Sequence, residues 1–126
     1  MKAQYDTQPS KFKDVKNGSI YYRYNIAEET TPASGGSEAK THWVCDEVIV
    51  WQRVTRNRVV SAVISDRWEA NHEQKLLNEY YSAILGIIEG EEAEAAIAAY
   101  KEFLVERRAL KASVEADCDE AGIVND

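Results

Sequence analysis

The stretch AIAAYKEFLVERRALKASV, residues 96–114, decides the fold, because one stripe of side chains runs along its whole length. The stripe advances in steps of three and four residues, which is the spacing of a helix with one buried face. It consists of Ala96, Tyr100, Phe103, Arg107, Leu110 and Val114. Ile97 and Leu104 widen it into a face broad enough for a helix-bundle core. We predict a helix over 91–117, roughly 40 Å long at 1.5 Å per residue.

Two shorter helices are predicted before this one. In the segment 71–86, Asn71 is a candidate N-cap and Gln74 stands where a capping box needs it. An apolar stripe follows, formed by Leu76, Leu77, Tyr80, Tyr81, Ile84 and Leu85. The segment 55–67 is ambiguous, because its β-branched content favours a strand while Thr55 as a cap and the spacing of its apolar residues favour a helix. We interpret it as a helix and keep the strand as the alternative.

The front of the chain has the spacing of β-strands. In SIYYRYNI, residues 19–26, aromatic and β-branched side chains recur at period two, and THWVCDEVIVWQ, residues 41–52, is rich in Val, Ile and Trp. The segment 1–18 is predicted as an irregular lead-in, and 27–40 as a long loop with Pro and Gly-Gly. We therefore predict an α+β fold, with a small N-terminal antiparallel β-sheet followed by three helices, the last one long.

The length fits a single domain over 1–126. We divide it into a β-rich part over 1–53, a helical part over 54–117 and an acidic tail over 118–126 that frays.

The net charge of −7 is unevenly distributed. Residues 1–68 hold ten Lys/Arg and eight Asp/Glu, which gives +2, whereas residues 69–126 hold five and fourteen, which gives −9. The acidic half would repel nucleic-acid phosphates, so we do not expect a nucleic-acid partner. The one concentration of basic residues is explained by a turn and a helix start that face solvent. It consists of Arg53, Arg56, Arg58 and Arg67.

The sequence predicts a soluble, cytoplasmic protein that does not act at a membrane. No apolar run is long enough to span a bilayer, and the start, MKAQYDTQPSKFKD, lacks the apolar segment of a signal peptide. The two cysteines, Cys45 and Cys118, lie 73 positions apart and fit a reducing compartment.

No pattern of chemistry-bearing residues indicates an enzyme, a metal site or a cofactor. His42 and Cys45 have ligand-like spacing, but residues three apart in a strand point to opposite faces. Gly-rich nucleotide-binding and hydrolase motifs are absent from the sequence. One acidic cluster contains a histidine but no second histidine and no nucleophile, so helix capping and solvated charge explain it better than acid–base chemistry. It consists of Asp66, Glu69, His72 and Glu73.

Protein association is the function that the last helix favours. The helices over 55–67 and 71–86 span only about half of it, so we expect a second copy of the chain, or another structural protein, to cover its distal half. Arg107 would then pair with Glu79 or with Glu106 of another copy, or extend to solvent. The predicted interface is Tyr100, Phe103, Leu104, Arg107, Leu110 and Val114.

Aromatic side chains crowd the two predicted strands, and a two-stranded sheet has little core in which to bury them. Exposed Tyr and Trp on a small sheet are typical of recognition surfaces. The possible recognition surface is Tyr22, Tyr24, Trp43 and Trp51.

Two stretches carry a resemblance: VVSAVISDRWEANHEQKLLNEYYSA, residues 59–83, and YKEFLVERRALKASVEAD, residues 100–117. Over about 54–117 the chain resembles small proteins encoded near tail and tail-fibre genes of bacteriophages and prophages. The resemblance implies a structural or assembly role, with virion association if the chain is of phage origin, and no catalytic residues to carry over. The alternative hypothesis is a nucleic-acid-associated regulator, or an acidic DNA mimic that engages a basic protein through the −9 half.

Overall fold

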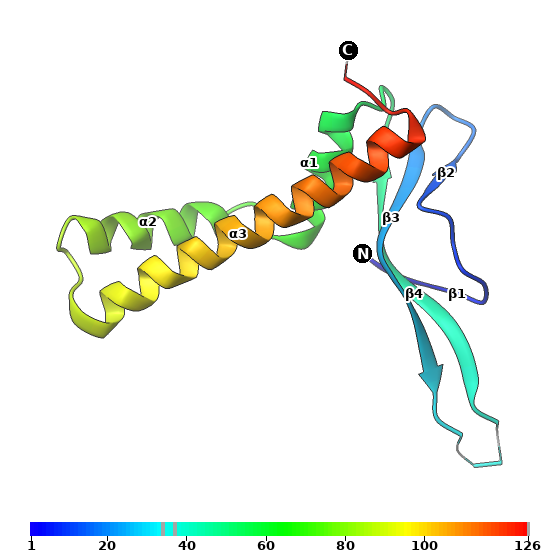
Figure 1. The fold of residues 1–126 in the computed structure, drawn as a ribbon, viewed down its shortest axis with the longest axis horizontal. Helices are drawn as coiled ribbons and strands as arrows, with labels where there is room; N and C mark the ends of the chain where they lie inside the picture. The colour runs from blue at the N-terminus through cyan, green and yellow to red at the C-terminus, as the bar shows by residue number, and fades with distance from the viewer. Residues whose placement is uncertain (34, 37, 126) are drawn as a thin grey trace.

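The computed structural model describes residues 1–33, 35–36 and 38–125, and in these residues the chain forms one antiparallel sheet and three α-helices. The sheet has the strand order β1-β4-β3-β2 (Figure 1). Its strands are β1 Lys2–Tyr5, β2 Phe12–Asp14, β3 Ile20–Thr31 and β4 Lys40–Val50. The helices are α1 Arg56–Arg67, α2 His72–Ile84 and α3 Gly90–Ala121. The predicted α+β class, with a sheet first and a long last helix, is confirmed.

The molecule has two parts joined by α3 (Figure 1). We call body the sheet together with α1 and residues 107–121 of α3. We call arm the hairpin formed by α2, the turn at 85–89 and residues 90–106 of α3. The arm projects away from the sheet, so that α3 lies along the body at its C-terminal end and along α2 at its N-terminal end.

The body is held together by a core between the sheet and the helices. Period two in β3 directs Tyr22 and Tyr24 toward the helices, where the Tyr22 hydroxyl donates to Asp117 of α3 at 2.6 Å. Val59 and Val63 of α1 meet these rings from one helix, fully buried. The core consists of Tyr22, Tyr24, Val48, Val50, Val59, Val60, Val63, Val114 and Cys118.

The first 18 residues are not the irregular segment that was predicted. Lys2 to Tyr5 pair with β4, and Phe12 to Asp14 pair with β3, where the Phe12 ring lies 4.8 Å from that of Tyr22. The predicted loop at 27–40 is also too long, since β3 and β4 stay paired as far as Thr31 and Lys40; residues 34 and 37 lie outside the described residues. Only two strands were expected because KAQY and FKD are too short to show a period.

A buried ion pair holds the other face of the sheet. Arg23 of β3 is 4% exposed, and its Nε donates to Glu47 Oε2 at 2.8 Å, while Nη1 donates to the Ser10 carbonyl oxygen at 3.1 Å. The guanidinium also lies over the Tyr5 ring, 4.6 Å from its centre. Burial alone would raise the pKa of Glu47, but the hydrogen bonds from Arg23 and Tyr5 outweigh it and lower the pKa below its ordinary value. Arg23 thus fastens β1 and the 6–11 segment onto the sheet.

The helix ends confirm one predicted cap and correct two expectations. Thr55 caps α1, its hydroxyl oxygen accepting from the Arg58 amide at 3.2 Å. Asn71 precedes α2 but makes no side-chain cap, and Gln74 donates to Asn78 instead of reaching back. The acidic tail does not fray: α3 continues to Ala121 and ends at a left-handed glycine, after which Asn125 accepts from the first turn of α1.

Candidate protein-association surface

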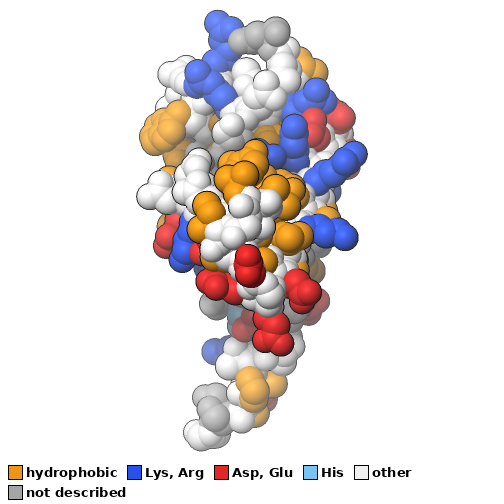
Figure 2. All heavy atoms as spheres, turned by 90° about the vertical axis from the view of Figure 1, so that its left-hand side faces the viewer, with side chains coloured by type: hydrophobic (Ala, Val, Ile, Leu, Met, Phe, Trp, Pro, Cys, Tyr) orange, Lys and Arg blue, Asp and Glu red, His pale blue; other side chains and the backbone are white. Residues whose placement is uncertain are grey.

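Most of the exposed large apolar side chains in the described residues lie on the arm. We call arm patch the seven large apolar side chains there that are 39–72% exposed, namely Tyr81, Ile84, Leu85, Ile87, Ile97, Leu104 and Val105. Figure 2 views the end of the arm and shows hydrophobic side chains gathered on it, with basic side chains to one side and acidic ones below. Monomeric soluble proteins rarely expose apolar side chains in one contiguous group of this kind.

The patch follows from the spacing of apolar residues in two helices. In α2, Tyr81, Ile84 and Leu85 lie three and four apart and therefore share a flank. In α3, Ile97, Leu104 and Val105 lie seven and eight apart, next to the stripe that faces α2. The turn between the helices adds Ile87. Each helix thus carries apolar side chains on a wider face than the other helix can cover.

Aromatic rings join the two flanks into one surface. The Tyr80 ring lies 5.0 Å from that of Tyr100 across the hairpin and 5.6 Å from that of Tyr81 along α2. Beside them runs a groove of about 340 Å³. The groove is lined by Tyr80, Ile97, Tyr100, Lys101, Leu104 and Val105. Tyrosine side chains are large, rigid and amphipathic, which suits a protein interface.

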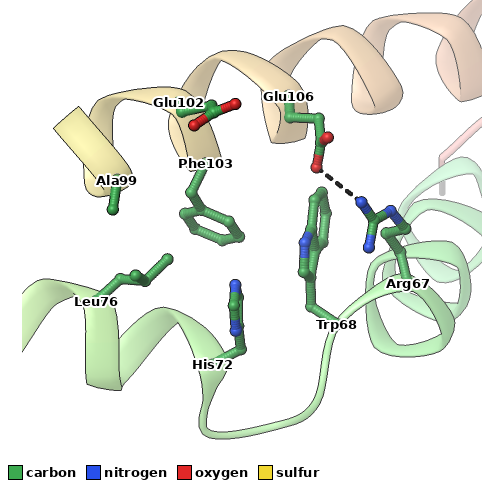
Figure 3. Close-up of a pocket in the computed structure, with 8 residues that line it drawn as sticks. All are labelled: Arg67, Trp68, His72, Leu76, Ala99, Glu102, Phe103 and Glu106. Atoms are coloured by element: carbon green, nitrogen blue, oxygen red, sulfur yellow. Dashed lines mark hydrogen bonds and ion pairs between the residues drawn. The ribbon is translucent and has the colours of Figure 1, made fainter. Parts of the chain in front are cut away.

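The opposite side of the arm is hollowed where α1, α2 and α3 meet (Figure 3). Trp68 and Phe103 meet edge to face at 5.0 Å, and His72 approaches Phe103 at 5.5 Å. At the rim Arg67 Nη2 donates to Glu106 Oε2 at 3.0 Å, and its guanidinium lies 4.9 Å from the Trp68 ring centre. The hollow is about 320 Å³, and the aromatic contacts and the ion pair on its walls are those of a packed junction between the three helices.

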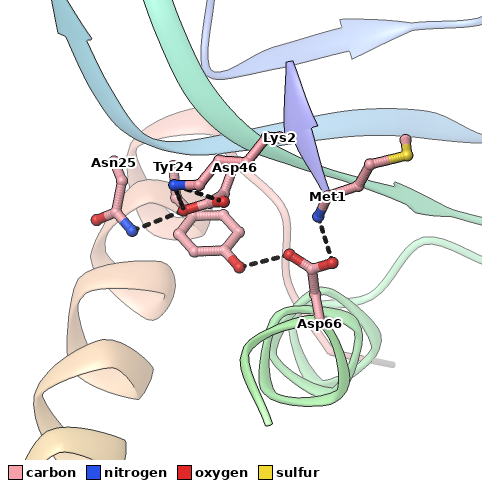
Figure 4. A network of polar contacts seen from close by, with 6 residues as sticks. All are labelled: Met1, Lys2, Tyr24, Asn25, Asp46 and Asp66. Atoms are coloured by element: carbon pink, nitrogen blue, oxygen red, sulfur yellow. Dashed lines mark hydrogen bonds and ion pairs between the residues drawn. The ribbon is translucent and has the colours of Figure 1, made fainter. Parts of the chain in front are cut away.

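The acidic cluster that contains His72 is not assembled into one site. Asp66 turns toward the sheet, where it accepts a hydrogen bond from the Tyr24 hydroxyl at 2.7 Å and one from the amino group of Met1 (Figure 4). His72 instead packs on Phe103. Across the described residues, no group of three or more His, Cys, Asp or Glu side chains could hold a metal ion.

The predicted interface assumed that the chain itself leaves the distal half of α3 uncovered, and this assumption is wrong. Val114 is 1% exposed and Phe103 6%, both covered by their own chain, and Leu110 packs against the core. The reason is that the chain turns at Trp68, so that α2 covers the proximal half while α1 and the sheet cover the distal half. Of the predicted interface residues, Leu104 is in the arm patch and Tyr100 lines its groove.

Arg107 is half-buried and makes no ion pair with Glu79 within the described residues, while its pairing with Glu106 of another copy stays a prediction. Glu106 of the same chain pairs with Arg67, and Glu79 lines a different hollow. Within the part of the chain that the structure describes, the Arg107 Nε is buried and has no hydrogen-bond partner.

The predicted aromatic recognition surface is also corrected. Tyr22 is fully buried and Tyr24 nearly so, because the helices cover their side of the sheet. Trp43 is half-buried, and only Trp51 is well exposed, at 60%. The four residues therefore do not form one surface. The arm patch was missed because its residues were assigned to the core of a bundle.

The remaining candidate groups are engaged within the chain. Arg56 donates to Asp119 at 3.0 Å and lies 3.8 Å from Glu115, so acids of α3 neutralise this member of the basic group. Both cysteines are buried and unbridged, and burial raises the pKa of the Cys118 thiol to about 11, which makes it a poor nucleophile. Among the helices of the described residues, none combines the length and apolarity that crossing a membrane requires.

A comparison with known proteins gives the chain no relatives: it matches no protein-family model, no curated protein and no solved structure.

Proposed function

We propose that this protein is a non-enzymatic structural or assembly module that associates with a second copy of itself through the arm patch. The observation that carries the proposal is the contiguous apolar surface on the arm, which belongs to neither the core of the body nor the α2–α3 contact. The resemblance to phage tail-region proteins suggests a biological setting of this kind.

The size of the patch supports a partner. Seven large side chains exposed by 39–72% present apolar surface on the order of several hundred Å². The largest patch of a typical monomer is roughly 300–600 Å², and each partner in a standard interface buries about 800 Å². The arm patch would form the apolar centre of such an interface, and the polar residues around it would have to supply the remaining area.

The experiment compares two valines that are equally exposed on different parts of the chain. Val105 in the arm patch is 63% exposed and Val124 in the body is 68% exposed. We expect the wild-type mass to rise with concentration in sedimentation velocity, Val105→Asp to stay monomeric, and Val124→Asp to behave as the wild type. Circular dichroism checks that all three keep the same helix content.

Two results would overturn the proposal. One is a wild-type chain that stays monomeric from about 1 µM to 1 mM, the range of ordinary specific affinities. The other is a Val105→Asp variant that associates as strongly as the wild type.

A further inference from the structure

The arm has the architecture of half a four-helix bundle. Although α2 is 13 residues long, none of its side chains, all within the described residues, is fully buried. The hairpin buries one stripe of α3 against α2 and leaves a second apolar flank, with the Tyr80–Tyr100 pair at its centre. In a four-helix bundle each helix is covered on two sides, and two hairpins packed face to face supply that cover.

Charge changes sign along α3, from the tip of the arm into the body. The tip, where α3 begins, carries exposed acids at Glu91 and Glu94. Three and six residues beyond Val105, in the part of α3 that belongs to the body, lie the exposed cations Arg108 and Lys111. No ion pair within the described residues uses these four side chains, whereas Glu106 and Glu115 on the same helix are paired.

This polarity decides between the two ways in which a second copy can pack. Parallel arms would bring the acidic tips together and the basic ends together, and like charges within a Debye length of about 8–10 Å repel. Antiparallel arms bring Glu91 and Glu94 of one copy close to Arg108 and Lys111 of the other. Arg108 and Lys111 are exposed, so their charged groups are accessible to the partner's tip.

We infer that the second copy packs its arm antiparallel and face to face on the first, so that the two hairpins form a four-helix bundle with the two bodies at opposite ends. This inference rests on the proposed function, because it specifies the partner and the orientation at the arm patch. The apolar flanks supply the attraction, and the tip and base charges set the direction. Lys101 also lines the groove, and a lysine at such an edge can cover apolar surface with its stem while its ammonium stays in water.

Charge reversal tests the orientation. The tip variant is Glu91→Lys with Glu94→Lys, the base variant is Arg108→Glu with Lys111→Glu, and the third variant combines all four changes. In the antiparallel bundle the tip and base variants each place like charges in contact, so we expect each to weaken self-association at least tenfold. The combined variant restores opposite charges at both ends and should return to near the wild-type affinity.

The matched control is Glu28→Lys with Glu29→Lys on β3, which changes the net charge as the tip variant does but lies on the body. It should self-associate as the wild type does. Sedimentation equilibrium at about 50 mM and 300 mM salt gives the affinities, and the charge effects should shrink at the higher salt.

The outcomes separate this inference from the proposed function. A wild-type chain that is monomeric at all concentrations overturns both. A wild type that associates, with tip and base variants as strong as the wild type or a combined variant that stays weak, overturns the antiparallel bundle and leaves the arm patch as the interface.

Discussion

The two halves of α3 share one pattern of apolar spacing and differ in what covers them. In the body, residues 107–121 lie against α1 and the sheet, and Val114 and Cys118 are almost completely buried. In the arm, residues 90–106 lie mainly against α2, with Trp68 and Arg67 meeting Phe103 and Glu106 only at its base, and Ala96 and Phe103 are the buried residues of this segment. A heptad-like stripe therefore shows that a helix needs cover on that side. It does not show how many neighbours provide the cover.

The same contrast appears in the polar groups. The C-terminal end of α3 is acidic, which its own dipole disfavours, but Asp117 and Asp119 accept from Tyr22 and Arg56 of the body. On the arm, Glu106 pairs with Arg67, whereas Glu91 and Glu94 at the tip are in no ion pair within the described residues. The acids at the C-terminal end of α3 thus find partners within the body, whereas the acids at the tip of the arm do not find them within the described residues.

The largest expected effect separates two valines of α3. Val114→Asp places a charge in the core of the body and should lower the free energy of unfolding by about 4 kcal/mol or more. Val105→Asp, nine residues earlier, should change the stability of the monomer by less than about 0.5 kcal/mol, because its side chain faces solvent. Urea unfolding at low protein concentration measures both. If the two variants lost similar amounts of unfolding free energy, the distinction between body and arm would be contradicted.

A second effect sharpens the account of the body. Arg23→Met leaves Glu47 charged and buried without its partner, which should cost about 3 kcal/mol at pH 7. The pKa of Glu47 is lowered in the folded protein, so the stabilisation that this carboxylate provides is present above its ordinary pKa of about 4.5 and is lost as the pH falls through the folded value. The difference between the wild type and the variant should therefore narrow below pH 4. A pH-independent difference in urea unfolding would contradict this assignment, and Arg58→Met, on an exposed arginine, is the matched control.

Local sequence patterns predicted the helices well. The apolar period of a helix lies within the helix itself, and a capping residue such as Thr55 lies directly next to it, so both can be recognised in a short segment of sequence. Local patterns missed β1 and β2, which are too short for a period and form only because β4 and β3 offer edges to pair with. The cover on Val114 was also beyond local reasoning, since it depends on the direction in which the chain turns at Trp68. Tyr22 and Tyr24 were assigned to an exposed surface because a sheet of two strands has too little core to bury them. In the structure they are buried, since helices α1 and α3 pack on their side of the sheet.

Amide hydrogen exchange at low and high protein concentration tests the central claim most directly, because it reports the cover of each segment separately. If the arm is an association element, protection should rise with concentration in α2 and in residues 90–106, while β3, β4 and residues 107–118 keep the same rates. Exchange that is independent of concentration along the whole chain, or that changes only in the body, would contradict the claim.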